Sequence, residues 1–468
     1  MRVLCNKSHF RYLSCKAEQT MTDIKSMFDP ETVVLIGSSR VREKVGMTSP
    51  DMFRSVIYNM TKFFKGETQI VDLEGKAGSK VIEELSQAPD LAVVMLPPDS
   101  AILQVKHAVE RGVKAFVLLT GGFKAPQRRQ LLDVVNKHGV RILGPNTIMG
   151  IINTANGLNT TFERDVMPRE GGISVVSQSG GVGACLLDWV CYYGIGVSKF
   201  VFVGDKVDVN DVDLLRYFEK DADTRVVCFY LEGVENGREF IDVAREVVKR
   251  KPILALKGGV TREAARRALS HTASVSGTDV VFDAAFKKAG IIRVEDIEEL
   301  LNSAVALSKQ PPLKGDNVAI VSNVGGPAIL AADAVVRNGF RLAVLSERTR
   351  VRIEKEFPGV EAVNPVDLIA DARKDRYSRV LDAVLSDREV DGVMVINMLK
   401  STFFEPEDAV VISEMSKKYP AKPIVDVPAG GEDFALVQKV LKDTNIPVYN
   451  LPEKAAKALR ALRLYGKR

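Results

Sequence analysis

The stretch SVVSQSGGVGACLLDWV, residues 174–190, contains the turn that decides the fold. A short β-branched run ends in Ser-Gln-Ser-Gly-Gly, and a helical pattern follows with apolar Ala184, Leu187 and Val190. A buried strand that turns directly into an amphipathic helix is typical of a parallel α/β unit. The same arrangement returns in AIVSNVGGPAILAADAVVRNG, residues 319–339. The single tryptophan, Trp189, is expected in the core.

Outward from this turn, short buried strands alternate with helical patterns along almost the whole chain. The clearest strands are TVVLIG (32–37), LAVVML (91–96), AFVLLT (115–120), VVCFYLEG (226–233) and PILALKGG (252–259). The alternation restarts near residue 171 and again after the Pro-rich KQPPLKG. We therefore predict an α/β protein of three doubly wound domains. The expected organisation is an N-terminal extension (1–20), domains at 21–155, 156–308 and 315–468, and a linker at 309–314.

Composition excludes several classes of protein. The net charge of +5 in 468 residues is spread along the chain, so it gives little support to nucleic-acid binding and would equally suit an anionic ligand. Five cysteines without a C-x-x-C pair favour a reduced, cytoplasmic protein with neither disulfides nor a zinc site. No apolar run is long enough to span a bilayer, and the N-terminus is a poor signal peptide.

Two glycine-rich helix starts are candidate phosphate sites. At Ser179 and Gly180 a helix start offers free N–H groups, a hydroxyl and no bulky side chain. Gly325 and Gly326 repeat this in the last domain, with Pro327 in the first helical turn. The alternative for each is an ordinary capped helix. Two such ends could face one phosphate from two sides.

The turn after the first strand is weaker. Gly37, Ser38 and Ser39 stand where a nucleotide phosphate often binds, but the full G-x-G-x-x-G is missing, so NAD is disfavoured. An ordinary strand-to-helix turn is the alternative.

His271 is one of four histidines and follows the helical pattern TREAARRALS among small residues. A lone histidine is most often a surface residue, but the residues that flank this one are small, so we do not expect its ring to be packed. Glu232 ends a predicted strand, where sites gather in such sheets. A carboxylate on one imidazole nitrogen would fix the tautomer and leave the other nitrogen as a nucleophile.

Seven collinear stretches together resemble the ADP-forming acyl-CoA synthetases, relatives of succinyl-CoA synthetase, and most closely the α subunit of the acetyl-CoA enzymes. They are FDPETVVLIGSS, GPNTIMGIIN, VVSQSGGVG, VDVNDVDLLRYFEKD, YLEGVENGREF, KGGVTREAARRALSHTAS and NPVDL. The resemblance covers residues 27–465. It implies a Rossmann-like CoA-binding domain followed by two flavodoxin-like CoA-ligase domains.

The resemblance also implies roles. His271 matches the histidine that is phosphorylated, Glu232 the glutamate that orients it, and the pairs at 179–180 and 325–326 the phosphate-facing helix starts. It places CoA contacts on Gly37, Ser38, Ser39, Arg40, Lys76, Pro97, Pro98, Thr120 and Gly121. Thr147, Lys124-Ala125 and the VDL at 71–73 depart from the family pattern, which puts details of the CoA and acyl contacts in doubt.

The implied reaction converts acyl-CoA, phosphate and ADP to acid, CoA and ATP through an acyl phosphate and a phosphohistidine. The loop of small residues around His271 would act as a carrier arm between two sites. No segment resembles the ATP-grasp module, so ADP or ATP with Mg²⁺ is expected on a separate β subunit in an α₂β₂ heterotetramer. Two alternatives stay open: a succinyl-CoA synthetase-like α subunit, and a non-catalytic acyl-CoA sensor.

Overall fold

The computed structural model describes residues 23–39, 49–73, 88–261, 263–264, 279–400 and 403–468. They form two compact units, Met1–Met167 with Phe202–Asp213 and Pro168–Val201 with Leu214–Arg468. The predicted extension at 1–20 and the predicted site residues Arg40, Lys76 and His271 lie outside the described ranges. None of the described helices is both long and apolar enough to cross a lipid bilayer.

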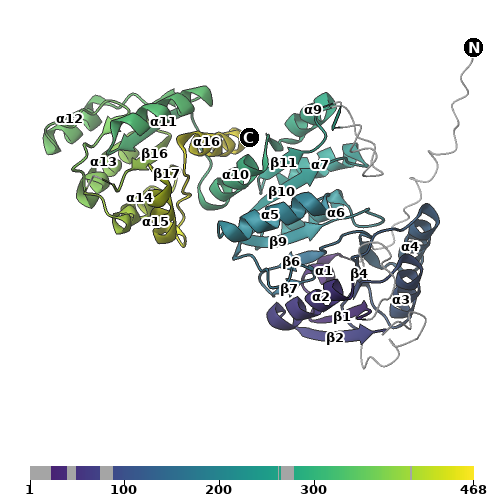
Figure 1. The fold of residues 1–468 in the computed structure, drawn as a ribbon. Helices are drawn as coiled ribbons and strands as arrows, with labels where there is room; N and C mark the ends of the chain where they lie inside the picture. Colours follow the sequence, from purple (N-terminus) through teal and green to yellow (C-terminus); the bar gives the residue numbers. More distant parts are fainter. Residues whose placement is uncertain (1–22, 40–48, 74–87, 262, 265–278, 401–402) are drawn as a thin grey trace, which may run out of the picture. The chain divides into compact units, whose positions relative to one another are not determined.

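The first unit is built on a parallel sheet with the strand order β2-β1-β3-β4-β5. Figure 1 labels β1, β2 and β4 of this sheet. Strand β1, TVVLIG, is buried from Val33 onward, as expected for a strand covered on both faces. Because the parallel strands β2 and β3 lie on opposite sides of β1, the strand order reverses there, and ligands bind at such points in open α/β sheets. The elements are α1 (Lys25–Phe28), β1 (Thr32–Gly37), α2 (Pro50–Phe63), β2 (Glu67–Asp72), β3 (Leu91–Val94), α3 (Pro98–Glu110), β4 (Ala115–Leu118), α4 (Ala125–His138), β5 (Arg141–Leu143), β6 (Ile151–Asn153) and β7 (Leu158–Asn159).

Within the second unit, the second sheet has the strand order β12-β11-β10-β8-β9. β8, β10, β11 and β12 are mutually parallel neighbours, so their carboxyl ends share one edge. Helix α5 begins at Gly180, directly after β8, as the quoted turn predicts. The elements are β8 (Glu170–Ser177), α5 (Gly180–Tyr192), β9 (Val197–Phe202), α6 (Asp211–Lys220), β10 (Val226–Leu231), α7 (Gly237–Val247), β11 (Ile253–Lys257), α9 (Asp279–Ala289), β12 (Ile292–Val294) and α10 (Ile297–Lys309).

The third sheet has the order β14-β13-β16-β17, with β15 also paired to β13. Successive residues of β13 enter two different hydrophobic clusters, one with Ala319 and Val321 and the other with Val318 and Ile320. This alternation shows that helices cover both faces of the sheet. The elements are β13 (Asn317–Ser322), α11 (Gly325–Arg337), β14 (Arg341–Leu342), α12 (Glu347–Glu356), β15 (Val366–Asp367), α13 (Lys374–Ser386), β16 (Gly392–Asn397), η2 (Pro406–Ala409), α14 (Val410–Lys418), β17 (Ile424–Pro428), α15 (Gly431–Leu441) and α16 (Pro452–Gly466).

Helix α10 contacts β8, β10 and β11 on one side and α16 on the other. Asp296 caps its start by accepting the N–H of Glu299 at 2.7 Å. Ala306 of this helix belongs to the same buried cluster as Val318 and Leu459. A single helix therefore contributes to the packing of both the second and the third sheet.

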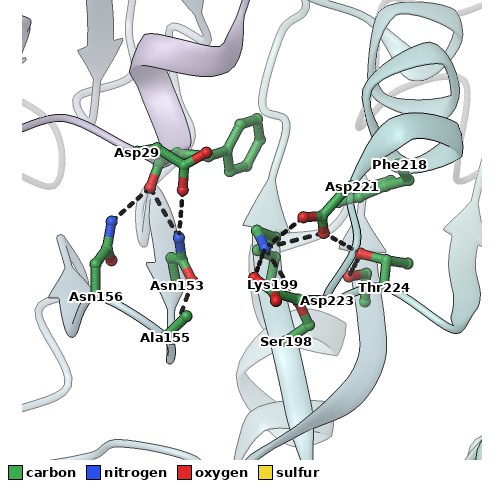
Figure 2. Close-up of polar contacts among 12 residues, drawn as sticks. Asp29, Asn153, Ala155, Asn156, Ser198, Lys199, Phe218, Asp221, Asp223 and Thr224 are labelled. Carbon is green, nitrogen blue, oxygen red and sulfur yellow. Dashed lines mark hydrogen bonds and ion pairs between the residues drawn. The ribbon is translucent and has the colours of Figure 1, made fainter.

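Two sets of buried polar contacts lie outside the candidate site described below. Lys199 of β9 is fully buried, and its ammonium lies 2.9 Å from Asp221 and 3.0 Å from Asp223 (Figure 2). In the first unit, the side-chain amides of Asn153 and Asn156 each donate to the Phe28 carbonyl at 2.8 Å. These contacts compensate the cost of burying polar groups, so we assign them a structural role.

Candidate functional site

The carboxyl ends of β8, β10 and β11 bring together residues that are far apart in the sequence. The turn after β8 carries Gln178 and Ser179, Glu232 follows β10, and Lys257 ends β11. Because the strands are parallel neighbours, these residues share one edge of the sheet. This is the edge at which open α/β sheets bind ligands.

Ser179 caps the start of α5. Its hydroxyl oxygen accepts the N–H of Val182 at 3.3 Å, while the hydroxyl of Ser177 donates to the Ser179 carbonyl at 2.7 Å. Gly180 and Gly181 open the helix without covering its first turn, and Gly181 is exposed. The helix is thus capped, and it still presents N–H groups and the positive end of its dipole to an anion.

The two carboxylate oxygens of Glu232 differ in their hydrogen bonding. Its Oε1 lies 3.3 Å from the Tyr230 hydroxyl, whereas its Oε2 is buried and has no hydrogen-bond partner among the described residues. Burial and the neighbouring Glu232 raise the pKa of Tyr230 to about 12, so this hydroxyl stays a donor at neutral pH. A buried carboxylate oxygen without a donor is rare in a native fold and is suited to accept an N–H from a further group.

A cation lies at the same edge. The Lys257 ammonium donates to the Gly258 carbonyl and stands 4.7 Å from the centre of the Phe282 ring. Burial lowers the pKa of Lys257, while the carboxylates of Asp279 and Glu232 oppose that shift. The chain that leaves this strand end leads to His271, whose place relative to Glu232 stays a prediction because it lies outside the described residues.

The corresponding turn of the third sheet also lies near a carboxylate. Helix α11 has no side-chain cap, and Gly325 and Gly326 are exposed. An Asp367 carboxylate oxygen lies 3.6 Å from the point that a β-carbon on Gly325 would occupy. The role of the two glycines in phosphate binding remains a prediction.

In the first unit the described members of the predicted CoA set gather at one sheet edge. Gly37 ends β1, and Ser38 and Ser39 follow it. Pro97 precedes α3 and Pro98 is its first residue, while Thr120 and Gly121 follow β4. These three strands are neighbours in the sheet.

Two of these groups are already engaged inside the fold. The Ser39 N–H donates to Asp72 at 2.9 Å, and the Thr120 hydroxyl donates to the Leu96 carbonyl at 2.6 Å. Thr120 is also buried, so its hydroxyl contributes to the packing of the turn. Contacts of these residues with CoA are not tested by the geometry.

Three residues of this site were not predicted from the sequence: Gln178, Tyr230 and Lys257. Gln178 lies in the turn quoted first, and the sequence does single it out, because an amide residue follows a serine in both SQSGG and SNVGG. Tyr230 and Lys257 carried no such signal, since each is the last or next-to-last residue of a buried strand.

Comparison with known proteins identifies the family. Residues 31–153 match the family described as CoA binding domain, and residues 170–307 match the succinyl-CoA ligase like flavodoxin domain. The α subunit of acetate–CoA ligase (ADP-forming) I from Pyrococcus furiosus is 33% identical over 463 residues, which cover 95% of this chain and 98% of the relative. The 4-hydroxybutyrate–CoA ligase (ADP-forming) of Nitrosopumilus maritimus is 33% identical over 94% of this chain but only 64% of the relative.

The fold agrees with these matches. The solved structure of the dinucleotide-forming acetyl-coenzyme A synthetase 1 of Ca. Korarchaeum cryptofilum, in complex with phosphate and ADP, is 30% identical. It has a TM-score of 0.85, and the match covers 95% of this chain and 97% of that one. The predicted fold class is thereby confirmed, and so is the resemblance on which the predicted activity rests. The chain belongs to the family of ADP-forming acyl-CoA ligases and is a relative of their α subunits.

Proposed function

We propose that this chain is the α subunit of an ADP-forming acyl-CoA synthetase. The enzyme would convert acyl-CoA, ADP and phosphate reversibly to a free acid, ATP and CoA. The observation that carries the proposal is the open, buried Glu232 oxygen at the sheet edge that also holds the uncovered start of α5. The relatives differ in the acid that their names give, acetate or 4-hydroxybutyrate, so the proposal leaves the acyl group open.

The proposed reaction has three steps. A phosphate oxygen attacks the thioester carbon, the C–S bond breaks, and CoA leaves. A nitrogen of His271 then attacks the phosphorus, and the P–O bond to the acyl group breaks to release the carboxylate. Finally a terminal oxygen of ADP attacks the same phosphorus and the P–N bond breaks.

Glu232 would accept the N–H of the second imidazole nitrogen. This contact fixes the tautomer and stabilises the ring as it gains positive charge. The start of α5, at Ser179 and Gly180, would bind the phosphoryl oxygens, and Gly325 and Gly326 would supply a second such start.

The proposed CoA site is the carboxyl edge of the first sheet. Gly37, Ser38 and Ser39 with Arg40 would meet phosphates at the reversal point, with Lys76, Pro97, Pro98, Thr120 and Gly121 around them. This placement is supported by the match of residues 31–153 to a CoA-binding family.

A separate β subunit is proposed to bind ADP with Mg²⁺ through an ATP-grasp module, in an α₂β₂ assembly. Two findings support a partner: the Pyrococcus relative is named an α subunit, and the Nitrosopumilus relative continues well beyond the part that this chain matches.

Labelling tests the proposal. The complex would be incubated with a panel of acyl-CoA thioesters and radioactive phosphate, and the α chain analysed for acid-labile, base-stable label. We expect label on His271 with at least one thioester, none in His271→Ala, and slower labelling in Glu232→Gln. Absence of label with every thioester would favour the acyl-CoA sensor instead.

A further inference from the structure

Gln178 connects the two halves of the candidate site. It lies in the turn that starts α5, and its Oε1 accepts the N–H of Glu232 at 2.7 Å and that of Gly233 at 3.1 Å. Its Nε2 donates to the Gly233 carbonyl at 2.8 Å, and its own N–H donates to the Tyr230 carbonyl at 3.2 Å. One side chain thus joins the helix start to the backbone that carries the carboxylate.

The third sheet contains a shorter version of the same connection. Asn323, in the turn between β13 and α11, accepts the Met398 N–H at 2.9 Å and donates to the Met398 carbonyl at 3.0 Å. β16 lies beside β13 as β10 lies beside β8, and Met398 is the first residue after its strand as Glu232 is, so Met398 corresponds to Glu232. The two-way bond between side-chain amide and backbone is therefore a general feature of this turn.

The two amide side chains differ by one methylene. Asn323 bonds to the N–H and the carbonyl of Met398, whereas the longer Gln178 accepts the N–H of Glu232 and also reaches the N–H and the carbonyl of Gly233. In the second sheet the amide therefore contacts two consecutive residues at the strand end that carries the candidate carboxylate.

The rest of the environment orients the Glu232 side chain. A β-carbon on Gly258 would lie 2.3 Å from the Tyr230 hydroxyl oxygen, so a residue without a side chain is needed there for the hydroxyl to stand beside Glu232. The hydroxyl then occupies the side of Oε1, and Oε2 has no hydrogen-bond partner in the part of the chain that the structure describes. The backbone of Glu232 is held by Gln178, and its carboxylate is held by the Tyr230 hydroxyl.

We propose that Gln178 is a positioning residue that holds the Glu232 carboxylate at a set distance from the phosphate-facing start of α5. It would touch no reacting atom. It would act by keeping the carboxylate and the helix start in one rigid frame, so that a phosphorylated ring can contact both. The inference rests on the proposed function for its rate effect, but the hydrogen bond itself can be tested without turnover.

The sharpest variant is Gln178→Leu, which keeps about the size of the side chain and removes its amide. We expect it to fold and to lose the bonds to the N–H groups of Glu232 and Gly233. Hydrogen exchange followed by NMR or mass spectrometry should then show faster exchange at the Glu232 amide. Single-turnover labelling of the α chain should slow about 10- to 100-fold, the cost of a misplaced group, with little change in the KM for acyl-CoA.

Gln310→Leu is the matched control. Gln310 also bonds through both ends of its amide, donating to the Asn445 carbonyl at 2.6 Å and accepting the Ile424 N–H at 2.8 Å, and we assign it no part in the site. This variant should lose stability without slowing the labelling step. Unchanged exchange at Glu232 and an unchanged labelling rate in Gln178→Leu would overturn the inference. Failure of the wild-type chain to label at all would instead contradict the proposed function.

Discussion

At the scale of single residues, the structure gives Gly37 a different reason to be glycine from the one that its motif suggests. A β-carbon on Gly37 would lie 2.4 Å from two ring atoms of Phe53, a fully buried residue of α2. The glycine is therefore required for the close approach of helix to strand, whether or not a phosphate binds nearby. Sequence patterns locate such a glycine but do not distinguish packing from ligand contact.

Gly37→Ala should accordingly destabilise the first unit by about 1–3 kcal/mol, because an added methyl forces the Phe53 ring or the helix to move. Urea unfolding followed by circular dichroism measures this. Gly237→Ala is the control, since nothing lies within 4 Å of an added β-carbon at that position. Its stability should be unchanged or higher by up to about 1 kcal/mol. Equal midpoints for wild type and Gly37→Ala would refute the packing argument.

At the scale of elements, strands were predictable because their burial is continuous, while one helix face was read incorrectly. Leu187 and Val190 of α5 are buried as expected. Trp189 is not in the core: it is 42% exposed and stacks on Tyr193 at 5.4 Å between ring centres. Aromatic residues next to an apolar stripe look like core residues in a sequence, and only the neighbouring elements decide how far they are covered.

Three helices of the third sheet are joined by one carboxylate. Asp382 of α13 accepts from Arg352 of α12 at 2.8 Å and from the Tyr419 hydroxyl, just after α14, at 2.6 Å, and Lys418 bonds to it as well. Burial acts to raise the pKa of Asp382, but hydrogen bonds from these three groups lower it to about 2. A folded-state pKa below the unfolded value means that the carboxylate stabilises the fold above about pH 4, and that this contribution is lost as the pH falls toward 2.

Asp382→Asn should therefore cost about 1 kcal/mol of unfolding free energy at pH 7, a value reduced because water still reaches the cluster. The difference from wild type should shrink steadily between pH 4 and pH 2, as measured by urea unfolding at each pH. Asp375→Asn, in the same helix but with an exposed i,i+4 partner in Arg379, should change stability by less than about 0.5 kcal/mol. A pH-independent difference for Asp382→Asn would rule out the charge as its cause.

At the scale of the whole molecule, the order of sheets followed from the sequence, whereas the inner structure of the site did not. Alternating buried runs and helical patterns indicated the three sheets, and parallel pairing then fixed which strand ends meet. The contacts of Gln178 are with a strand neighbour more than 50 residues away in the sequence, a distance that no local pattern encodes. The predicted domain boundaries and the position of His271 remain predictions.

The proposed assembly places the phosphorylated histidine on this chain and the nucleotide on a partner subunit. The chain alone should then accept a phosphoryl group but should not complete the catalytic cycle. Purified without the β subunit and given acyl-CoA with radioactive phosphate, it should incorporate at most one phosphoryl group per chain, and added ADP should neither remove the label nor yield ATP. Adding the β subunit with Mg²⁺ and ADP should release the label as ATP and start steady turnover, which a luciferase assay follows. His271→Ala in the same mixture controls for contaminating kinases. ATP formation by the chain alone would show that it binds the nucleotide itself, because a phosphohistidine needs an acceptor within reach to pass its phosphoryl group on.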